Sequence, residues 1–379
     1  MKLAIRALQG MQAGPRVAGR RFAGDMVLGA CLLFATAALA QQTAPTFTTF
    51  DAPGAGTGAG LGTLGLDMNS AGTVTGWYAD SSGLSHGFVR DPSGALTTFD
   101  APGGDQGTVG LSINRAGTIA GHYYDANFVD HGFVRAAGGA ITAFDAVGAS
   151  ATPFLGTFIG GINAVGTVAG YYFDAGVVCH SFVRMADGTI TAFDAPGGGT
   201  GAHQGTAGLA INAAGAVTGY YTDASNVNHG FVRASDGVIT GFDVTVAGNA
   251  SGQGTVGFAI NAAGAIAGNY LDADNLSHGF VRDSGGGMAT FTAPNAGGSG
   301  TFASGIDAAG FITGYYTDAS SVYHAYVRAK NGAMTTFQAP GAGANTGQGV
   351  FPSAINDSGS IVGFYADARD GFRAFLLTP

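Results

Sequence analysis

Residues 208–223 read Gly-Leu-Ala-Ile-Asn-Ala-Ala-Gly-Ala-Val-Thr-Gly-Tyr-Tyr-Thr-Asp, and the same pattern recurs seven times along the chain. This copy continues with His-Gly-Phe-Val-Arg (229–233) and closes with Val-Ile-Thr-Gly-Phe-Asp (238–243). The central Asn, replaced once by Asp, recurs at spacings of 45, 49, 49, 49, 46 and 49 residues. Its positions are Asn69, Asn114, Asn163, Asn212, Asn261, Asp307 and Asn356. A period of this length indicates a propeller or a solenoid, in which each unit buries its apolar face against its neighbours.

Each copy contains four short runs with strand character, separated by turns that contain Gly. In the second copy these runs are 110–113, 118–124, 131–135 and 140–145. No segment shows helical periodicity, and runs of this length are too short to cross a bilayer as an outer-membrane barrel. The sequence therefore predicts an all-β fold, a seven-bladed β-propeller with four antiparallel strands per blade.

The two ends of the repeat region complement each other. Residues 46–53 supply a fourth-strand motif with no preceding three, whereas the last copy supplies three strand runs with no fourth. We expect the N-terminal strand to complete the last blade, which hides the edges that an open array leaves exposed. A solenoid is the alternative, but it needs capping repeats at both ends, and the sequence shows none.

The first forty residues carry the features of an export signal. Basic residues precede an apolar run over 26–40 that ends in Ala38-Leu39-Ala40, a small-x-small cleavage motif. We predict a signal peptide over 1–40, a single propeller domain over 41–379, and a secreted or periplasmic protein. Arg20-Arg21-Phe22 leaves both the general and the twin-arginine export routes open. We interpret Cys31 as an ordinary signal-peptide residue, because the apolar run continues beyond it, and that run is too short for a membrane span.

After residue 40 the chain carries ten basic residues and 23 acids, all of them Asp, for a net charge of −13. A strongly acidic chain without a basic cluster argues against nucleic acid and anionic membrane surfaces as partners. Cys179 is the only cysteine of this region, so no intramolecular disulfide can form. We expect a monomer that needs no cofactor and no metal.

The motif Ile-Asn-x-x-Gly-x-Val-x-Gly, followed by His-Gly-Phe-Val-Arg and Gly-x-Ile-Thr-x-Phe-Asp, resembles the bacterial extracellular HAF repeats. That family takes its name from a His-Ala-Phe tripeptide, which appears here as His229-Gly230-Phe231 and, in the last copy, as Arg373-Ala374-Phe375. The resemblance covers roughly residues 46–379. It implies export and a β-repeat fold, and it supplies no catalytic residues.

A His and an Asp recur at fixed positions in six copies. The histidines are His86, His131, His180, His229, His278 and His324, and the aspartates are Asp80, Asp125, Asp174, Asp223, Asp272 and Asp318. Both residue types bind metals. Equivalent positions of a ring lie far apart, however, so we predict a His–Asp hydrogen bond that pins the second-to-third connection of each blade. The Arg after Phe-Val and the Asp that ends the fourth strand are further expected pairing groups.

Repeated bulky residues are interpreted as core. The tyrosine pairs of the second strand, such as Tyr220-Tyr221, point to opposite faces of a blade, where each packs on a neighbour. A carbohydrate-stacking platform is the alternative for these rings.

Residues that break the repeat are the candidates for binding. Trp77, His122 and Asn269 each replace the first Tyr of the pair, and His203 sits in a fourth-to-first linker. Phe154, Leu155 and Phe158 accompany an insertion in the third copy. Residues 272–275 alternate oxygen ligands as a calcium loop does, but they lack the Glu and the rest of that loop, so we interpret them as a solvated turn.

The loops suggest where a ligand binds. Connections after the first and third strands are short, whereas the fourth-to-first linkers vary most and share a face with the second-to-third turns. Binding sites commonly lie on variable loops over a rigid scaffold. The sequence contains no nucleophile elbow, phosphate loop or zinc-protease motif. We therefore predict a binding or scaffolding module for a glycan, peptide or protein ligand. A hydrolase or lyase with its site in the central channel is the alternative.

Overall fold

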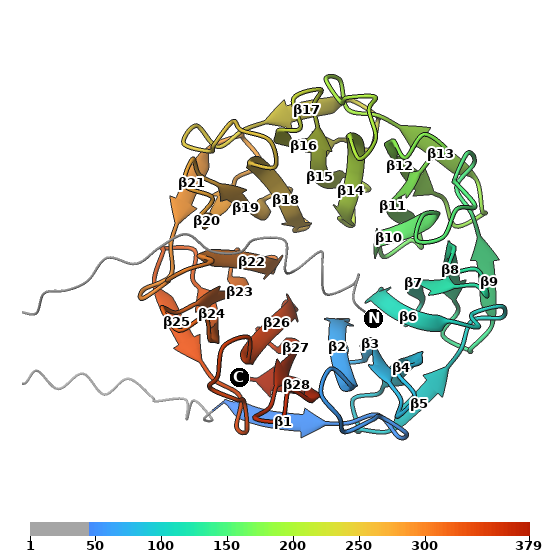
Figure 1. Ribbon diagram of the computed structural model, residues 1–379, viewed down its shortest axis with the longest axis vertical. Helices are drawn as coiled ribbons and strands as arrows, with labels where there is room; N and C mark the ends of the chain where they lie inside the picture. Colours follow the sequence, from blue (N-terminus) through green and yellow to red (C-terminus); the bar gives the residue numbers. More distant parts are fainter. Residues whose placement is uncertain (1–44) are drawn as a thin grey trace, which may run out of the picture.

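The structure, a computed structural model, describes residues 45–379, and its regular elements there are 28 β-strands. None of these residues forms a helix, so this part of the chain has no helix that spans a membrane. The predicted signal peptide lies outside the described residues. Figure 1 shows the strands in successive groups around a ring, with the first strand of each group innermost.

The strands repeat in the order that the sequence predicts. The first strands are β2 (Gly62–Met68), β6 (Gly107–Ile113), β10 (Thr157–Ile162), β14 (Gly205–Ile211), β18 (Gly254–Ile260), β22 (Thr301–Ile306) and β26 (Gly349–Ile355). The second strands are β3 (Val74–Ala79), β7 (Ile119–Tyr124), β11 (Val168–Phe173), β15 (Val217–Thr222), β19 (Ile266–Leu271), β23 (Ile312–Thr317) and β27 (Ile361–Ala366). The third strands are β4 (Ser85–Arg90), β8 (Asp130–Arg135), β12 (Cys179–Arg184), β16 (Asn228–Arg233), β20 (Ser277–Arg282), β24 (Tyr323–Arg328) and β28 (Phe372–Thr378). The fourth strands are β5 (Leu96–Phe99), β9 (Ile141–Phe144), β13 (Ile190–Phe193), β17 (Ile239–Phe242), β21 (Met288–Phe291), β25 (Met334–Phe337) and β1 (Thr46–Phe50).

Strand pairing is antiparallel within each group, and we number the groups 1 to 7 from β2 to β28. In group 7 the fourth position is taken by β1, which pairs with β28 from Thr46↔Thr378 to Phe50↔Ala374. At six of the seven junctions, neighbouring groups touch through one parallel pair near the start of a third strand and of the next first strand, as at Asn228↔Gly254. The prediction of an all-β, propeller-like fold is confirmed.

Antiparallel pairing divides the connections between two faces of the ring. Turns after the first and third strands lie on one face, which we call the Asn face. Turns after the second strands and the linkers after the fourth strands lie on the other, which we call the linker face. The parallel pairs between groups keep this orientation the same from group to group.

The Asn face owes its regularity to the repeated Asn of the first turn. Asn212 is buried; its Oδ1 accepts the N–H of Ala214 and of Ala216, and its Nδ2 donates to the carbonyl of Asn261 in the next group at 3.1 Å. The last group contacts the first in the same way, because Asn356 Nδ2 donates to Asn69 O at 3.2 Å. The repeated Asn therefore fixes its own turn and the position of the neighbouring group.

The core lies between neighbouring groups. The aromatic residue of each third strand, Tyr326 in group 6 and Phe in the other groups, is fully buried. At Phe231, the preceding group's fourth-strand Phe193 meets it edge to face, with ring centroids 6.0 Å apart. Arg233 lies 4.9 Å over the ring of Phe193 as well, so the repeated Arg makes a cation–π contact instead of the expected ion pair. Five of the first strands begin with Gly, and Gly156 and Gly300 directly precede the other two. At Gly254 a larger residue has no space, since a Cβ there would lie 1.9 Å from the carbonyl oxygen of Asn228.

Candidate functional site

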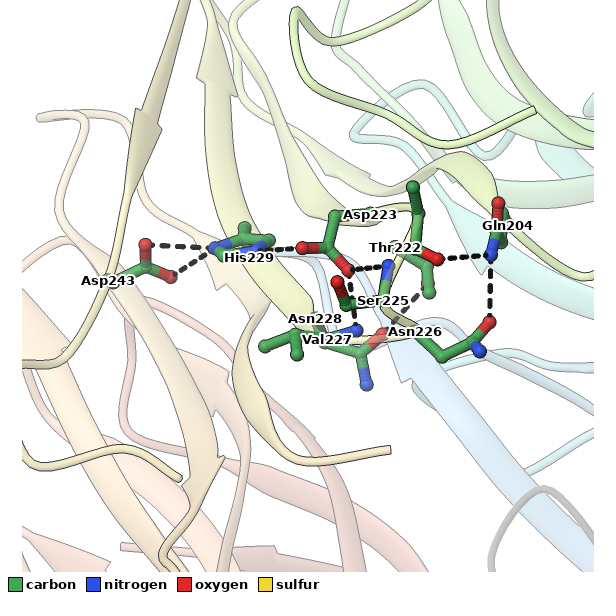
Figure 2. A network of polar contacts seen from close by, with 10 residues as sticks. Gln204, Thr222, Asp223, Ser225, Asn226, Val227, Asn228, His229 and Asp243 are labelled. Atoms are coloured by element: carbon green, nitrogen blue, oxygen red, sulfur yellow. Dashed lines mark hydrogen bonds and ion pairs between the residues drawn. The ribbon is translucent and has the colours of Figure 1, made fainter. Parts of the chain in front are cut away.

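The repeated His sits in a clamp on the linker face. Figure 2 shows the clamp of group 4, where His229 Nδ1 lies 2.9 Å from Asp243 Oδ2 and Nε2 lies 3.6 Å from Asp223 Oδ2. The second Tyr of the pair, Tyr221, stacks on the imidazole with ring centroids 4.9 Å apart. The Asp223 carboxylate also accepts two backbone N–H groups of its own turn at 2.8 Å. The clamp thus ties the end of the fourth strand to the second-to-third turn.

The other groups repeat this clamp with small changes. The contacts are those of His86 with Asp80 and Asp100, His131 with Asp125 and Asp145, His180 with Asp174 and Asp194, His278 with Asp272 and Thr292, and His324 with Asp318 and Gln338. In group 7 an arginine takes the place of His, and Arg373 contacts both Asp51 and Asp367. Every group therefore has a cation or imidazole between its two linker-face connections.

Two details of the clamp differ from the sequence-based expectation. In groups 1 to 4 the closer carboxylate is the one that ends the fourth strand, at 2.8–3.0 Å, whereas the turn Asp lies at 3.6–3.7 Å. The partners are also not buried, because 51% of the Asp243 side chain and 29% of the Asp223 side chain are exposed. Solvent screens such pairs, so each contributes about 1 kcal/mol or less.

The clamps do not have the geometry of a metal site. Among residues 45–379 no group of three or more His, Cys or Asp side chains is arranged to hold a metal ion. At the calcium-like turn, Asp272 Oδ1 accepts backbone N–H groups of its own turn, and Oδ2 lies 2.9 Å from His278 Nε2. Hydrogen bonds of this kind favour the charged carboxylate: the hydroxyl of Ser82, with turn N–H groups and His86, lowers the pKa of Asp80 to about 2.

The structure places two of the four repeat-breaking residues, His122 and Asn269, between groups. Trp77 and His122 are half-buried, and Asn269 is buried with its Oδ1 accepting the N–H of Ala303 in the next group at 2.7 Å. Asn269 therefore links two groups, and its contact with a ligand stays a prediction. His203 alone is exposed, on the linker face.

A position on the linker face that the sequence analysis missed sets groups 2 and 3 apart. The third residue after each turn Asp has a positive φ, and in groups 1 to 7 it is Gly83, Phe128, Val177, Asn226, Asn275, Ser321 and Asp370. Gly, Asn and Asp tolerate this conformation, whereas a bulky or β-branched side chain is a steric outlier there. Phe128 (φ 61°) and Val177 (φ 64°) are the outliers.

The linker residue that contacts this turn follows the same pattern. The N–H of Phe154 donates to Phe128 O at 2.7 Å, and that of His203 donates to Val177 O at 2.8 Å. The equivalent donors elsewhere are Gly60, Gly252 and Gly347. Phe154 (φ 65°) and His203 (φ 64°) thus adopt a conformation that costs roughly 1–2 kcal/mol for a residue with a Cβ. Strain of this kind concentrates at functional sites.

The two phenylalanines form an exposed aromatic pair. Their ring centroids lie 5.4 Å apart, and 40% of Phe128 and 48% of Phe154 remain exposed. Val147 of the same linker is 81% exposed. Solvent-exposed aromatic side chains lack the burial that stabilises the aromatic side chains of the core between groups.

Leu155 extends the apolar surface toward group 3. It occupies the linker position of Gln204, whose Nε2 donates to Asn226 Oδ1 of the next turn at 3.0 Å (Figure 2). Val177 is the counterpart of Asn226, so apolar residues occupy both positions that carry this amide pair in group 4. We call Phe128, Phe154, Leu155 and Val177 the apolar junction.

A chain of aromatic rings leads into the interior from His203, whose N–H contacts Val177 of the apolar junction. Between ring centroids, the distance is 6.2 Å from His203 to Phe173 and 6.0 Å from Phe173 to Phe158. The ring centroid of Phe158 lies 6.1 Å from that of His122. The exposed His203 and the half-buried His122 of the sequence analysis therefore belong to one neighbourhood in groups 2 to 4.

Two buried polar atoms without a partner lie in the same neighbourhood. They are Asp130 Oδ1 and His122 Nδ1; the other such side-chain atoms of residues 45–379 are six arginine Nε atoms. Burial raises the pKa of Asp130 to about 8 and lowers that of His122 to about 4. Cys179 and Ser277, the counterparts of Asp130, donate to backbone carbonyls of the next group, so a protonated Asp130 has the donor that this position uses.

The missed residues carry a signal that the sequence does contain. Phe128 and Val177 stand where other copies have Gly, Asn, Ser or Asp, three residues after the repeated Asp. Asp130 stands where the other copies have Ser, Cys, Asn, Tyr or Phe. Both deviations become visible once the copies are aligned on the turn Asp, whereas alignment on the Tyr pair brings out Trp77, His122 and Asn269.

Comparisons with known proteins identify the fold. No family model matches this chain, and no curated protein matches it. Virginiamycin B lyase from Staphylococcus aureus is structurally similar, with a TM-score of 0.55 and 15% identity over 89% of this chain and 100% of that one. The chain has a β-propeller fold. At this identity the likeness concerns the fold alone.

Two further propellers are more distant. The Aleuria aurantia lectin, described as a six-bladed β-propeller that recognises fucose, aligns with a TM-score of 0.38 and 14% identity over 70% of this chain and 89% of that one. TolB from Acinetobacter baumannii aligns with a TM-score of 0.42 and 12% identity over 78% of this chain and 76% of that one. Neither alignment is close enough to carry an argument about the site.

Proposed function

We propose that this protein is an exported seven-bladed propeller of the HAF-repeat type that acts as a binding module, with its ligand site at the apolar junction of the linker face. Pairing of β1 with β28 and the Asn356–Asn69 contact support a ring closed by the N-terminal strand. The signal-like segment 1–40 supports secretion or a periplasmic location, after cleavage at Ala40.

One observation carries the binding function. On the linker face, where groups 2, 3 and 4 meet, four residues with bulky side chains have left-handed backbone conformations, and two of them are exposed phenylalanines. The four residues are Phe128, Phe154, Val177 and His203. Neither the fold nor solubility requires them, since other groups use Gly, Asn, Ser or Asp at the same positions. A rigid scaffold that presents strained, exposed aromatic residues on one set of loops is suited to recognition of a glycan, peptide or protein.

A catalytic site in the centre of the ring has little support. The first strands, which are innermost, contain one acidic residue, Asp67. Its Oδ2 accepts hydrogen bonds from the hydroxyl of Ser112 at 2.8 Å and from the N–H of Ile113 at 2.9 Å. Hydrolases and lyases that use general acid–base chemistry commonly need a second titratable group within reach. The first strands supply no second carboxylate beside Asp67.

The proposal is tested with glycan and peptide arrays probed by the purified protein and by a Phe154→Gly variant. We expect specific binding to members of one ligand class and its loss in the variant, whose residue is that of Gly252 and Gly347. Binding that is unchanged in the variant, or no binding on either array, contradicts the proposed module.

A further inference from the structure

The charges of the protein divide unequally between the two faces. Strand direction assigns sixteen of the 23 aspartates of residues 45–379 to the linker face, together with two of the ten basic residues, Arg369 and Arg373. The linker-face aspartates are Asp51, Asp80, Asp100, Asp105, Asp125, Asp130, Asp145, Asp174, Asp194, Asp223, Asp243, Asp272, Asp274, Asp318, Asp367 and Asp370. With neutral histidines, and with the buried Asp130 protonated because its pKa is about 8, the linker face therefore carries a formal charge of −13, and the Asn face +1.

The position of the basic residues accounts for this division. Each third strand of groups 1 to 6 ends in Arg at the Asn face, where the guanidinium lies over a Phe ring. The turn and fourth-strand aspartates end strands that run in the opposite direction. Arg369 and Arg373 belong to group 7, so no Lys or Arg accompanies the acids of groups 2 to 4 on the linker face.

We infer that the apolar junction is the anchor site for a basic polypeptide segment, which places an apolar or aromatic side chain on Phe128 and Phe154 and its lysines or arginines toward the surrounding aspartates. This inference rests on the proposed binding function and specifies the ligand. It follows from two features of one surface: an exposed aromatic pair, and an excess of aspartates with no Lys or Arg on the linker face of groups 2 to 4.

The charge of the linker face selects among occupants. An acidic peptide or a polyanion meets like charge on every side, which costs affinity and slows association. A basic segment gains from the field over about a Debye length and from contact of its cations with the faces of the two rings. A neutral saccharide uses the rings but gains nothing from the acids.

The test uses fluorescence anisotropy with a short labelled peptide of lysine and phenylalanine and the purified full-length or exported protein. We expect saturable binding that weakens as salt is raised from about 50 to 500 mM, because exposed charges are then screened. The double variant Phe128→Asn, Phe154→Gly should lower affinity at least about tenfold, as removal of a central aromatic anchor does. Its new residues are those of Asn226 and Gly252 in group 4, so the backbone accepts them.

The matched control is Phe311→Ala, since Phe311 is also 40% exposed but lies in a turn of the Asn face. It should leave binding unchanged, and thermal melting should show all variants folded. Equal binding of the double variant, or equal binding of a peptide with glutamate in place of lysine, overturns the inference. If the lysine peptide fails while an array glycan binds in a Phe154-dependent way, the binding module stands and the basic ligand is rejected.

Discussion

The Asn face and the linker face are built from the same repeated sequence, yet one is uniform and the other is not. On the Asn face, the side chains of Asn69, Asn114, Asn212, Asn261 and Asn356 each donate to the carbonyl of the residue in the equivalent position of the next group, at 2.9–3.2 Å. On the linker face, the left-handed position is filled by residues as different as Gly83 and Phe128.

The difference has a physical reason. The repeated Asn has to satisfy two N–H groups of its own turn and one neighbouring carbonyl, and few side chains have that geometry. The left-handed position requires only a positive φ, which several residue types can adopt with different conformational free energies. Sequence variation that supports binding therefore occurs on the linker face, where the fold constrains the choice of residue less than on the Asn face.

Removing β1 tests whether both faces depend on the junction of the two chain ends. Deletion of residues 41–54 removes the pairing with β28 and the stacking of Phe47 on Phe375, and it exposes a strand edge. We expect the melting temperature to fall by about 10 °C or more, with aggregation. Deletion of residues 41–44, which precede β1, is the control. Equal melting of the two truncations would show that β1 does not close the ring.

A substitution on the uniform face should have the next largest effect. Asn212→Ala removes two turn hydrogen bonds and leaves the Asn261 carbonyl without its partner, which costs about 2–3 kcal/mol of unfolding free energy. Denaturant unfolding measures this. Asn331→Ala, which removes one hydrogen bond in an exposed turn, should cost under about 1 kcal/mol. Similar losses at both sites would contradict the special role of the Asn face.

The buried Asp130 gives the neighbourhood of the apolar junction a pH dependence. Its folded pKa, about 8, lies above the ordinary value of 3.8, so the contribution to stability is complete below pH 4 and is lost as the pH rises to 8. Asp130→Asn cannot ionise and should be more stable than the parent by about 1–3 kcal/mol at pH 8, with a smaller difference at pH 4. Thermal unfolding against pH measures this, and parallel curves for the two proteins would refute the assignment.

Relief of strain on the variable face should stabilise the protein. Phe154→Gly removes a side chain from φ 65° and should raise the unfolding free energy by about 1 kcal/mol. The reverse change, Gly252→Phe, adds a side chain where a Cβ meets no atom within 4 Å, so it should cost about the same through φ alone. If Phe154→Gly destabilises the fold as a core substitution does, the apolar junction is part of the core and not a binding site.

The clamps should have the smallest effect. His229→Ala leaves Asp243 and Asp223 in contact with water and should cost about 0.5–1 kcal/mol. Burial alone would raise the pKa of Asp223, but its turn N–H groups and His229 lower it below the ordinary value, so its contribution is lost as the pH falls through the acid range. A chelator should not change the melting temperature, and a fall of several degrees would restore a metal to the clamps.

Sequence reasoning reached the architecture because each copy repeats a local code. Short runs with strand character, Gly at turns and the complementary ends predicted four-stranded units and the pairing of the N-terminal strand with the last unit. It predicted the contact between His and the turn Asp, but not that the exposed Asp at the end of the fourth strand lies closer to His229. That difference depends on how the fourth strand returns beside the third.

The candidate site was only partly within reach. His203, Phe154, Leu155 and His122 were singled out because they break the repeat, whereas Phe128 and Val177 were overlooked. Their significance comes from a positive φ, which no single residue name reveals.

The sequence by itself determined the period, the strand inventory, the net charge and the residues that deviate from the repeat, because all of these are properties of local order along the chain. Tertiary structure decided which deviations meet. Antiparallel strand direction sends the arginines to one face and most aspartates to the other, and the return of each linker over the preceding turn brings Phe154 against Phe128, 26 positions earlier in the chain. Contacts between distant positions and the sharing of one face depend on how strands pair in space, so only the folded ring combines strain, exposure and charge into one candidate site.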